Sequence, residues 1–147
     1  MADTVSKAPP RPTEEFLDEL VSIFNAAPIA RSLGMSIEYN ERGEAACTFP
    51  RNPDYDHGGH DVHGGVLATL LDTAAWFTVA ARYGHAVVTS DLHVRMLRPA
   101  RRLGLRATAK VVRLGSKAAV TQMEVVDEGG ALVAVGTASL ARIGQTP

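Results

Sequence analysis

The feature that most constrains the fold of this chain is a long apolar segment that contains one acid. Residues 65–81 carry a single charged side chain, Asp72, and could bury a helix on nearly every side. On such a helix, the residues three and four positions from Asp72 are alanine, threonine and tryptophan, so no cation is available locally to pair with it. Since desolvating an unpaired carboxylate costs roughly several kcal/mol, Asp72 is a candidate for chemistry. The alternative is a carboxylate at a wet crevice, or one that accepts hydrogen bonds from a distant segment.

The start of this segment is the second informative feature. His63 and two glycines, Gly64 and Gly65, precede the apolar run, and Gly84 follows it. This pattern predicts a helix from Gly64 to about residue 82 that Gly84 ends. The unsatisfied N–H groups at a helix start suit an oxygen that gains negative charge during nucleophilic attack, and glycine allows close approach.

The flanking segments predict an α+β fold. Thr13 can cap a helix that ends near Pro28, residues 35–49 read as a hairpin, and residues 50–62 as a loop. After the long helix, alternation predicts a half-buried strand with one mostly apolar face: Val88, Ser90, Leu92, Val94 and Met96. Further strands are predicted near 103–113, 118–126 and 132–142, with short turns between them. We therefore expect an antiparallel sheet that wraps one central helix, with the strand order left open.

Length and composition indicate one domain of ordinary size. We expect a flexible N-terminal tail over residues 1–12 and a single domain over residues 13–147. Residues 1–13 are polar and rich in proline, so we expect no signal peptide, no membrane association and a cytoplasmic location. The single cysteine, Cys47, is expected to be a small core residue of a strand, not a catalytic thiol.

Charge is distributed unevenly along the chain. Residues 1–61 carry eleven acids and five bases, whereas residues 92–123 carry eight bases and no acid. The basic stretch could attract a polyanion, although a solvated face of antiparallel strands explains each single residue as well. The net charge of −1 and an aromatic content of 5% argue against a nucleic-acid partner.

Three stretches of the sequence carry a resemblance to a known family. They are residues 63–74 (HGGVLATLLDTA), residues 97–100 (LRPA) and residues 127–138 (DEGGALVAVGTA). From about residue 33 to residue 142, the chain resembles the hotdog-fold thioesterases, specifically their PaaI-like branch. The resemblance implies a hotdog fold, in which a curved antiparallel sheet wraps a long central helix. It also implies hydrolysis of an acyl-CoA to free acid and CoA, by a homodimer with active sites at its interface that commonly forms a homotetramer.

The resemblance assigns roles to residues around the helix start. Asp72 would be the general base or nucleophile, and Gly64 would supply a backbone N–H to the thioester carbonyl. His63 would orient the same loop, and Gly65 would contact substrate. Ser90 lies eighteen positions after Asp72, where related enzymes often have a hydroxyl near the attacking water. The alternative for Ser90 is a structural hydroxyl on an inward strand face.

Two positions depart from the family pattern. His57 stands where the family commonly has an asparagine that holds the carbonyl or water, so either its imidazole replaces the amide or the loop uses Asn52. His60 stands where a small or polar residue is common. CoA phosphates could meet a basic cluster through charge-assisted hydrogen bonds, and its members are Arg95, Arg98, Arg101 and Arg102.

This chemistry requires no cofactor. One backbone donor to a developing oxyanion lowers a barrier by about 3–4 kcal/mol, and a positioned base contributes roughly 10²–10⁴-fold. We therefore expect neither a metal nor a cofactor.

Three other functions remain open at this stage. A zinc-type site could form in the loop from His57, His60 and His63 beside its aspartates. A hotdog hydratase or dehydratase would use the acid to move protons along the acyl chain, and a non-catalytic sensor would only bind acyl-CoA. The identity of the acyl group, and whether Asp72 activates water or forms an anhydride, also stay open.

Overall fold

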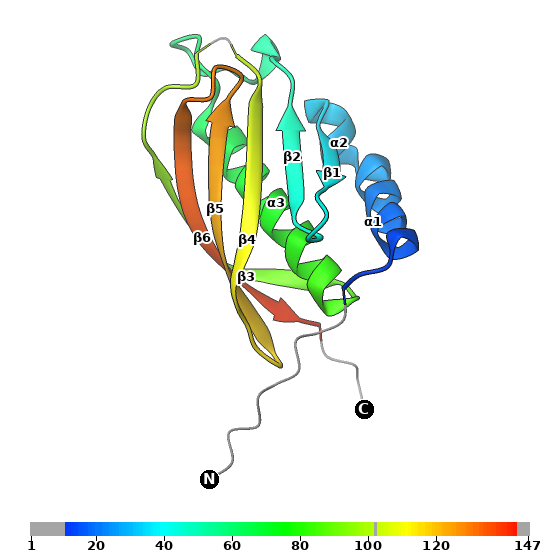
Figure 1. Ribbon diagram of the computed structural model, residues 1–147. Helices are drawn as coiled ribbons and strands as arrows, with labels where there is room; N and C mark the ends of the chain where they lie inside the picture. Colours follow the sequence, from blue (N-terminus) through cyan, green and yellow to red (C-terminus); the bar gives the residue numbers. More distant parts are fainter. Residues whose placement is uncertain (1–10, 102, 144–147) are drawn as a thin grey trace.

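The computed structural model describes residues 11–101 and 103–143, and it confirms the predicted α+β architecture. Six antiparallel strands form one sheet, in the order β1-β2-β4-β5-β6-β3, which curves around the helix α3 (Figure 1). Of the predicted tail, residues 1–10 lie outside the described part of the chain. The elements are α1 (Glu14–Ala26), α2 (Pro28–Leu33), β1 (Ser36–Tyr39), β2 (Ala45–Phe49), the 3₁₀ turn η1 (Pro53–Tyr55), α3 (Gly64–Tyr83), β3 (Val87–Met96), β4 (Leu105–Leu114), β5 (Ala118–Asp127) and β6 (Leu132–Arg142).

The central helix α3 has the predicted bounds. Gly84 ends it in the left-handed conformation, with φ of 72°, which favours glycine. Leu70 and Leu71 are fully buried, and α3 packs against β2, β3, β4, β5 and β6 inside the curve of the sheet (Figure 1). Its length and hydropathy would suffice to cross a membrane, but 61% of its most apolar window is buried inside the protein. A core helix meets the same criterion, and that is the role of α3 here.

The N-terminal region contains one helix more than predicted. Thr13 caps α1 by accepting a hydrogen bond from the Phe16 N–H at 3.2 Å. Phe24 packs edge-on against Phe77 of α3, with ring centroids 5.3 Å apart. Pro28 ends α1 near the predicted position but also begins α2, because proline is well tolerated at the first position of a helix.

The β1–β2 hairpin is fastened to α3 by two hydrogen bonds. The backbone N–H of Ala45 donates to the Thr78 hydroxyl at 2.8 Å, and the Tyr39 hydroxyl donates to the Phe77 carbonyl at 3.1 Å. Cys47 of β2 is fully buried, and this burial raises the pKa of its thiol to about 12. The expectation of a core cysteine is confirmed.

Strand β3 differs from the predicted alternation at one point. The register of β3 against β6 shifts between Thr89 and Asp91, which makes Ser90 the extra residue of a β-bulge. Because a bulge reverses the side-chain alternation, Val87 and Thr89 face α3 before it, whereas Leu92 and later even-numbered residues face α3 after it. The predicted inward positions of Val88 and Ser90 are therefore wrong, and both side chains are exposed.

Candidate active site

Asp72 lies half-buried on α3, and its partner comes from β3. The Thr89 hydroxyl donates a hydrogen bond to Asp72 Oδ1 at 2.7 Å. Among the described residues, no cation forms an ion pair with Asp72, and its second oxygen, Oδ2, has no protein donor. The carboxylate is thus held in place by one hydroxyl and keeps one oxygen available to a water or a substrate.

The hydroxyl predicted at Ser90 is supplied by its neighbour. Ser90 donates instead to the Ser139 carbonyl at 3.0 Å, on the exposed side of the sheet. The bulge accounts for this correction, because it turns Ser90 away from α3 and leaves Thr89 opposite Asp72. Two consecutive apolar residues, Val87 and Val88, are one sign in the sequence that the alternation is irregular there.

The start of α3 presents one unused backbone donor. His63 is the N-cap residue, and its Nδ1 accepts a hydrogen bond from the Gly65 N–H at 2.9 Å. The Val66 N–H donates to the His63 carbonyl at 2.9 Å. Within residues 11–101 and 103–143, the Gly64 N–H has no acceptor. The His63 cap therefore gives the Gly65 N–H an acceptor and leaves the Gly64 N–H available at the positive end of the helix dipole.

The loop before α3 is braced by an ion pair and backbone bonds. Arg51 donates to both carboxylate oxygens of Asp56, and only 8% of the Asp56 side chain is exposed. Asp56 also forms a β-bridge with Val62, and the His63 N–H donates to the Tyr55 carbonyl at 2.9 Å. These contacts fix the position of His63, and with it the first residue of the helix.

His57, His60 and Asn52 serve the loop itself in this structure. His57 Nδ1 accepts a hydrogen bond from the Gly59 N–H at 2.9 Å, at an exposed turn where His60 adopts a left-handed φ of 63°. Asn52 accepts from the Asp54 N–H at 3.0 Å and caps η1. Neither His57 nor Asn52 has a hydrogen bond to Gly64 or Asp72.

The histidines of the loop do not gather into a metal-binding group. In the part of the chain that the structure describes, no three His, Cys, Asp or Glu side chains are arranged to hold a metal ion. The ring nitrogens of His57 and His63 that face the backbone accept hydrogen bonds from it. The rival prediction of a loop metal site thus finds no assembled ligand set among these residues.

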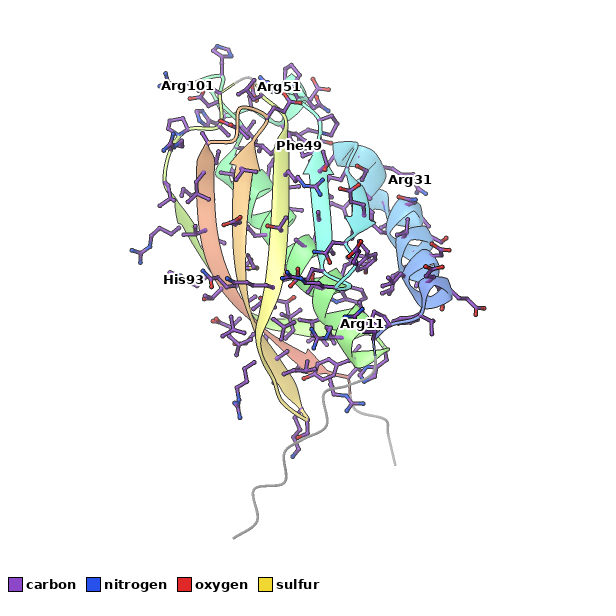
Figure 2. The ribbon with its side chains drawn as sticks, in the orientation of Figure 1. Arg11, Arg31, Phe49, Arg51, His93 and Arg101 are labelled. Carbon is purple, nitrogen blue, oxygen red and sulfur yellow. The ribbon has the colours of Figure 1, made fainter. Side chains whose placement is uncertain are left out.

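Three of the predicted CoA-binding arginines, Arg95, Arg98 and Arg101, lie in the described part of the chain, where they are exposed and Arg95 is separate from the others. Arg101 lies 3.8 Å from an oxygen of Asp61 and shares one end of the molecule with Arg51 (Figure 2). Arg98 follows β3 at its Met96 end, while Arg95 pairs with Val135 and points to the sheet face opposite α3. Arg102, also predicted for this cluster, lies outside the described residues.

The two chemical groups of the candidate site lie on one rigid helix. Gly64 and Asp72 are eight residues apart in α3, which corresponds to about 12 Å along the axis. A backbone donor, a carbonyl group, an attacking water and a base in reacting contact span about 10 Å when fully extended. The backbones of Gly64 and Asp72 in one chain are therefore farther apart than this span.

Two hollows lie near these elements. A recess of about 370 Å³ opens beside the helix start and is lined by Leu33, Asp54, Tyr55, Asp56, His63, Gly65, Val66 and Thr69. Another, of about 380 Å³, lies between the β1–β2 hairpin and strands β4 and β5, around the ion pair of Arg106 and Glu38. Of these two recesses, only the first is lined by predicted site residues, His63 and Gly65. The candidate binding site is therefore the recess at the start of α3.

Comparison with known proteins identifies the family of this chain. Residues 59–134, more than half of the chain, match the family described as the thioesterase superfamily. The chain is 31% identical over 129 residues to the medium/long-chain acyl-CoA thioesterase YigI of Escherichia coli, covering 76% of this chain and 83% of that one. It is 32% identical over 118 residues to the acyl-coenzyme A thioesterase PaaI of E. coli, covering 80% and 84%. A putative esterase of Halobacterium salinarum is 41% identical over 101 residues, which cover 64% of this chain and 66% of that relative.

Solved structures share the fold. The E. coli PaaI protein has a TM-score of 0.82 at 28% identity, over 90% of this chain and 96% of that one. The BH2602 protein of Bacillus halodurans, solved with CoA, has a TM-score of 0.76 at 26% identity, over 99% and 100%. The sequence match and the shared fold lead to one conclusion: this chain belongs to the thioesterase superfamily and has its hotdog fold.

Proposed function

We propose that this protein hydrolyses acyl-CoA thioesters, with Asp72 and the Gly64 N–H as its reacting groups. The observation that carries the proposal is the pairing of an unused N–H at the start of α3 with a carboxylate that Thr89 holds from one side. The names of the relatives YigI and PaaI support the substrate class. The thioester bond supplies the electrophile, so the chain needs only a base and an oxyanion donor.

The reaction follows from these groups. The thioester oxygen accepts a hydrogen bond from the Gly64 N–H, which stabilises the negative charge that forms during attack. Asp72 takes a proton from a water, the water oxygen bonds to the carbonyl carbon, and the bond from carbon to sulfur breaks. The proton then passes to the CoA thiolate, and the products are a free acid and CoA. In the variant with Asp72 as nucleophile, its oxygen attacks the carbonyl carbon, the bond from carbon to sulfur breaks and the CoA thiolate leaves. Water then hydrolyses the resulting anhydride to the free acid and the Asp72 carboxylate, and a proton from the water passes to the thiolate.

Two copies of the chain complete the site in this proposal. The backbones of Gly64 and Asp72 are about 12 Å apart along α3, more than the span of about 10 Å from a backbone donor through a carbonyl and a water to a base, so Gly64 of one copy would act with Asp72 of its partner. Strand β3 pairs only with β6 among the described strands, and its outer edge is ten residues long. It also exposes two apolar side chains, Val88 and Leu92. Because an exposed apolar edge of this length is a pairing surface, the proposal takes a homodimer as the minimal active unit, and a homotetramer as a pair of such dimers.

The substrate's nucleotide would be bound by exposed arginines. Arg98 and Arg101 lie in the chain just after β3 ends, and Arg101 lies at the loop end of the molecule (Figure 2). Their guanidinium groups can form charge-assisted hydrogen bonds to the phosphates of CoA. Arg95, on the other face of the sheet, would contribute only from a second copy.

A thiol-release assay on a panel of acyl-CoAs tests the proposed function. Asp72→Asn keeps the shape and the Thr89 hydrogen bond but removes the base, so kcat should fall by about 10²–10⁴-fold while CoA binding, measured by calorimetry, persists. Asp91→Asn is the matched control, because Asp91 is an exposed acid on the opposite face of β3, and it should keep full activity.

Each rival function has its own outcome with the same panel of acyl-CoAs, and binding with neither thiol release nor hydration would identify a non-catalytic sensor. Enoyl-CoA hydration without thiol release would identify a hydratase, and activity that chelation abolishes and zinc restores would identify a metal enzyme. Unchanged turnover in Asp72→Asn would refute the mechanism.

A further inference from the structure

The start of α3 has a neighbour that the sequence did not predict, Met96 at the end of β3. A methyl group placed on Gly64 would lie 3.1 Å from both the Sδ and the Cε atoms of Met96. The absence of a side chain on Gly64 therefore lets the thioether lie directly against the first residue of the helix. This contact is next to the Gly64 N–H that has no acceptor among the described residues.

The strand register fixes the side of β3 from which Met96 projects. Met96 pairs with Ala134 and Thr89 pairs with Leu140, and both partners are buried on the face that packs against α3. Met96 thus shares a face with Thr89, which contacts the catalytic carboxylate. However, 47% of Met96 is exposed, so the core does not enclose it. A flexible apolar side chain borders the candidate site without being needed to fill the core.

We propose that Met96 selects the acyl group of the substrate, an inference that rests on the proposed thioesterase function. A carbonyl oxygen about 3 Å from the Gly64 N–H brings the first carbons of the acyl group beside the Met96 thioether. An unbranched thioether adapts its shape to a straight alkyl chain. A ring attached directly to the carbonyl carbon, as in a benzoyl group, is rigid and wide at that point and has to displace the thioether from its place against Gly64. The wild-type protein therefore favours straight-chain acyl-CoAs over aromatic ones.

The test compares kcat/KM for benzoyl-CoA and hexanoyl-CoA in matched variants. Because a single methylene in an apolar pocket changes discrimination by about 10–200-fold, Met96→Ala should raise the ratio of benzoyl to hexanoyl by about tenfold or more. Met96→Leu preserves volume and should keep the ratio within about threefold of wild type. Leu97→Ala removes a neighbouring side chain that is also 47% exposed, and it should leave the ratio unchanged. An unchanged ratio in Met96→Ala, or an equal change in Leu97→Ala, overturns the proposal.

A binding measurement tests the contact independently of turnover. The chain has four methionines, so protein labelled with ¹³C at the methionine methyl groups gives a small set of resonances, and Met96→Leu identifies that of Met96. Adding hexanoyl-CoA to labelled Asp72→Asn protein should shift the Met96 signal, and a shift confined to other methionines overturns the proposal. If wild type hydrolyses acyl-CoAs and Asp72→Asn does not, a negative result here rejects the role of Met96 alone. If wild type releases no thiol from any acyl-CoA, the proposed function itself fails.

Discussion

Mixing two inactive variants tests whether the site is shared between copies of the chain. Asp72→Asn removes the base, and Gly64→Pro removes the backbone donor. Proline is tolerated there because Gly64 is the first residue of α3, and His63 before it has φ of −60° and ψ of 136°, which a following proline permits. Gly64→Ala is the matched control, since it adds a Cβ against Met96 as proline does but keeps the N–H.

The expected magnitudes follow from the geometry. Loss of one oxyanion donor costs about 10²–10³ in kcat, so Gly64→Pro should fall by that factor below Gly64→Ala. In a mixed dimer, the Gly64 of one chain meets the Asp72 of the other at one site, while the second site lacks both groups. Random assortment in a two-fold dimer makes half of the dimers mixed, which gives about 25% of wild-type activity.

Co-refolding equal amounts of Asp72→Asn and Gly64→Pro, followed by the thiol-release assay, measures this recovery. A mixture of Gly64→Pro with the double variant carrying both changes should recover nothing, because no intact pair can form. If the first mixture stays as inactive as its components while size measurements show exchanged dimers, the shared-site argument is refuted. Donor and base would then act within one chain.

Three further results are expected. Thr89→Val removes the hydroxyl that holds Asp72 and should lower kcat about tenfold or more, given about 1.5–3 kcal/mol for a hydrogen bond to a charged group. Ser90→Ala should leave kcat unchanged, and a larger loss of kcat in Ser90→Ala than in Thr89→Val would restore Ser90 to its predicted role. Asp72→Asn should tighten the dimer about tenfold or more, because an amide costs less to desolvate than a carboxylate when a partner covers α3; sedimentation equilibrium that shows weaker association would contradict this. Because burial raises the pKa of Cys47 to about 12, the folded state holds the thiol proton more tightly, and this stability is lost as the pH rises above about 8.5. Between about pH 7 and pH 10, the free energy of unfolding measured with urea should therefore fall by about 2 kcal/mol more in wild type than in Cys47→Ala. Equal decreases in the two proteins would contradict this prediction.

The elements that depend on long periodic patterns were predictable from the sequence. The bounds of α3 follow from an apolar run between His63 and Gly84, since hydrophobic residues, a cap and a left-handed glycine all indicate the same helix. The four strands after it follow from alternation and short turns. The strand order could not be predicted, because β2 pairs with β4, which follows it in the sequence only after α3 and β3, and no local pattern indicates that pairing.

The hydrogen-bond partner of the Asp72 carboxylate was not predictable, because one extra residue in β3 decides it. A strict period of two would put Ser90 on the same face of β3 as Leu92. The bulge between Thr89 and Asp91 moves Ser90 to the other face. The contact of Met96 with Gly64 is similarly invisible in the sequence, since it depends on where β3 ends relative to the start of α3. The role of His57 could not be predicted from its place in the family pattern either. In the structure its ring accepts a hydrogen bond from the Gly59 N–H of its own loop.

The rigidity of α3 is the reason that the proposed site calls for two copies of the chain. Helix rise fixes the separation of the Gly64 and Asp72 backbones at about 12 Å, and neither group can approach the other by a motion within the helix. Thr89 holds the carboxylate toward β3, and the loop brace of Arg51 and Asp56 holds the helix start. Each half is therefore preorganised but incomplete. In a two-fold dimer, one interface would complete both sites at once. An isolated chain would then lack a complete site and should not hydrolyse the substrate.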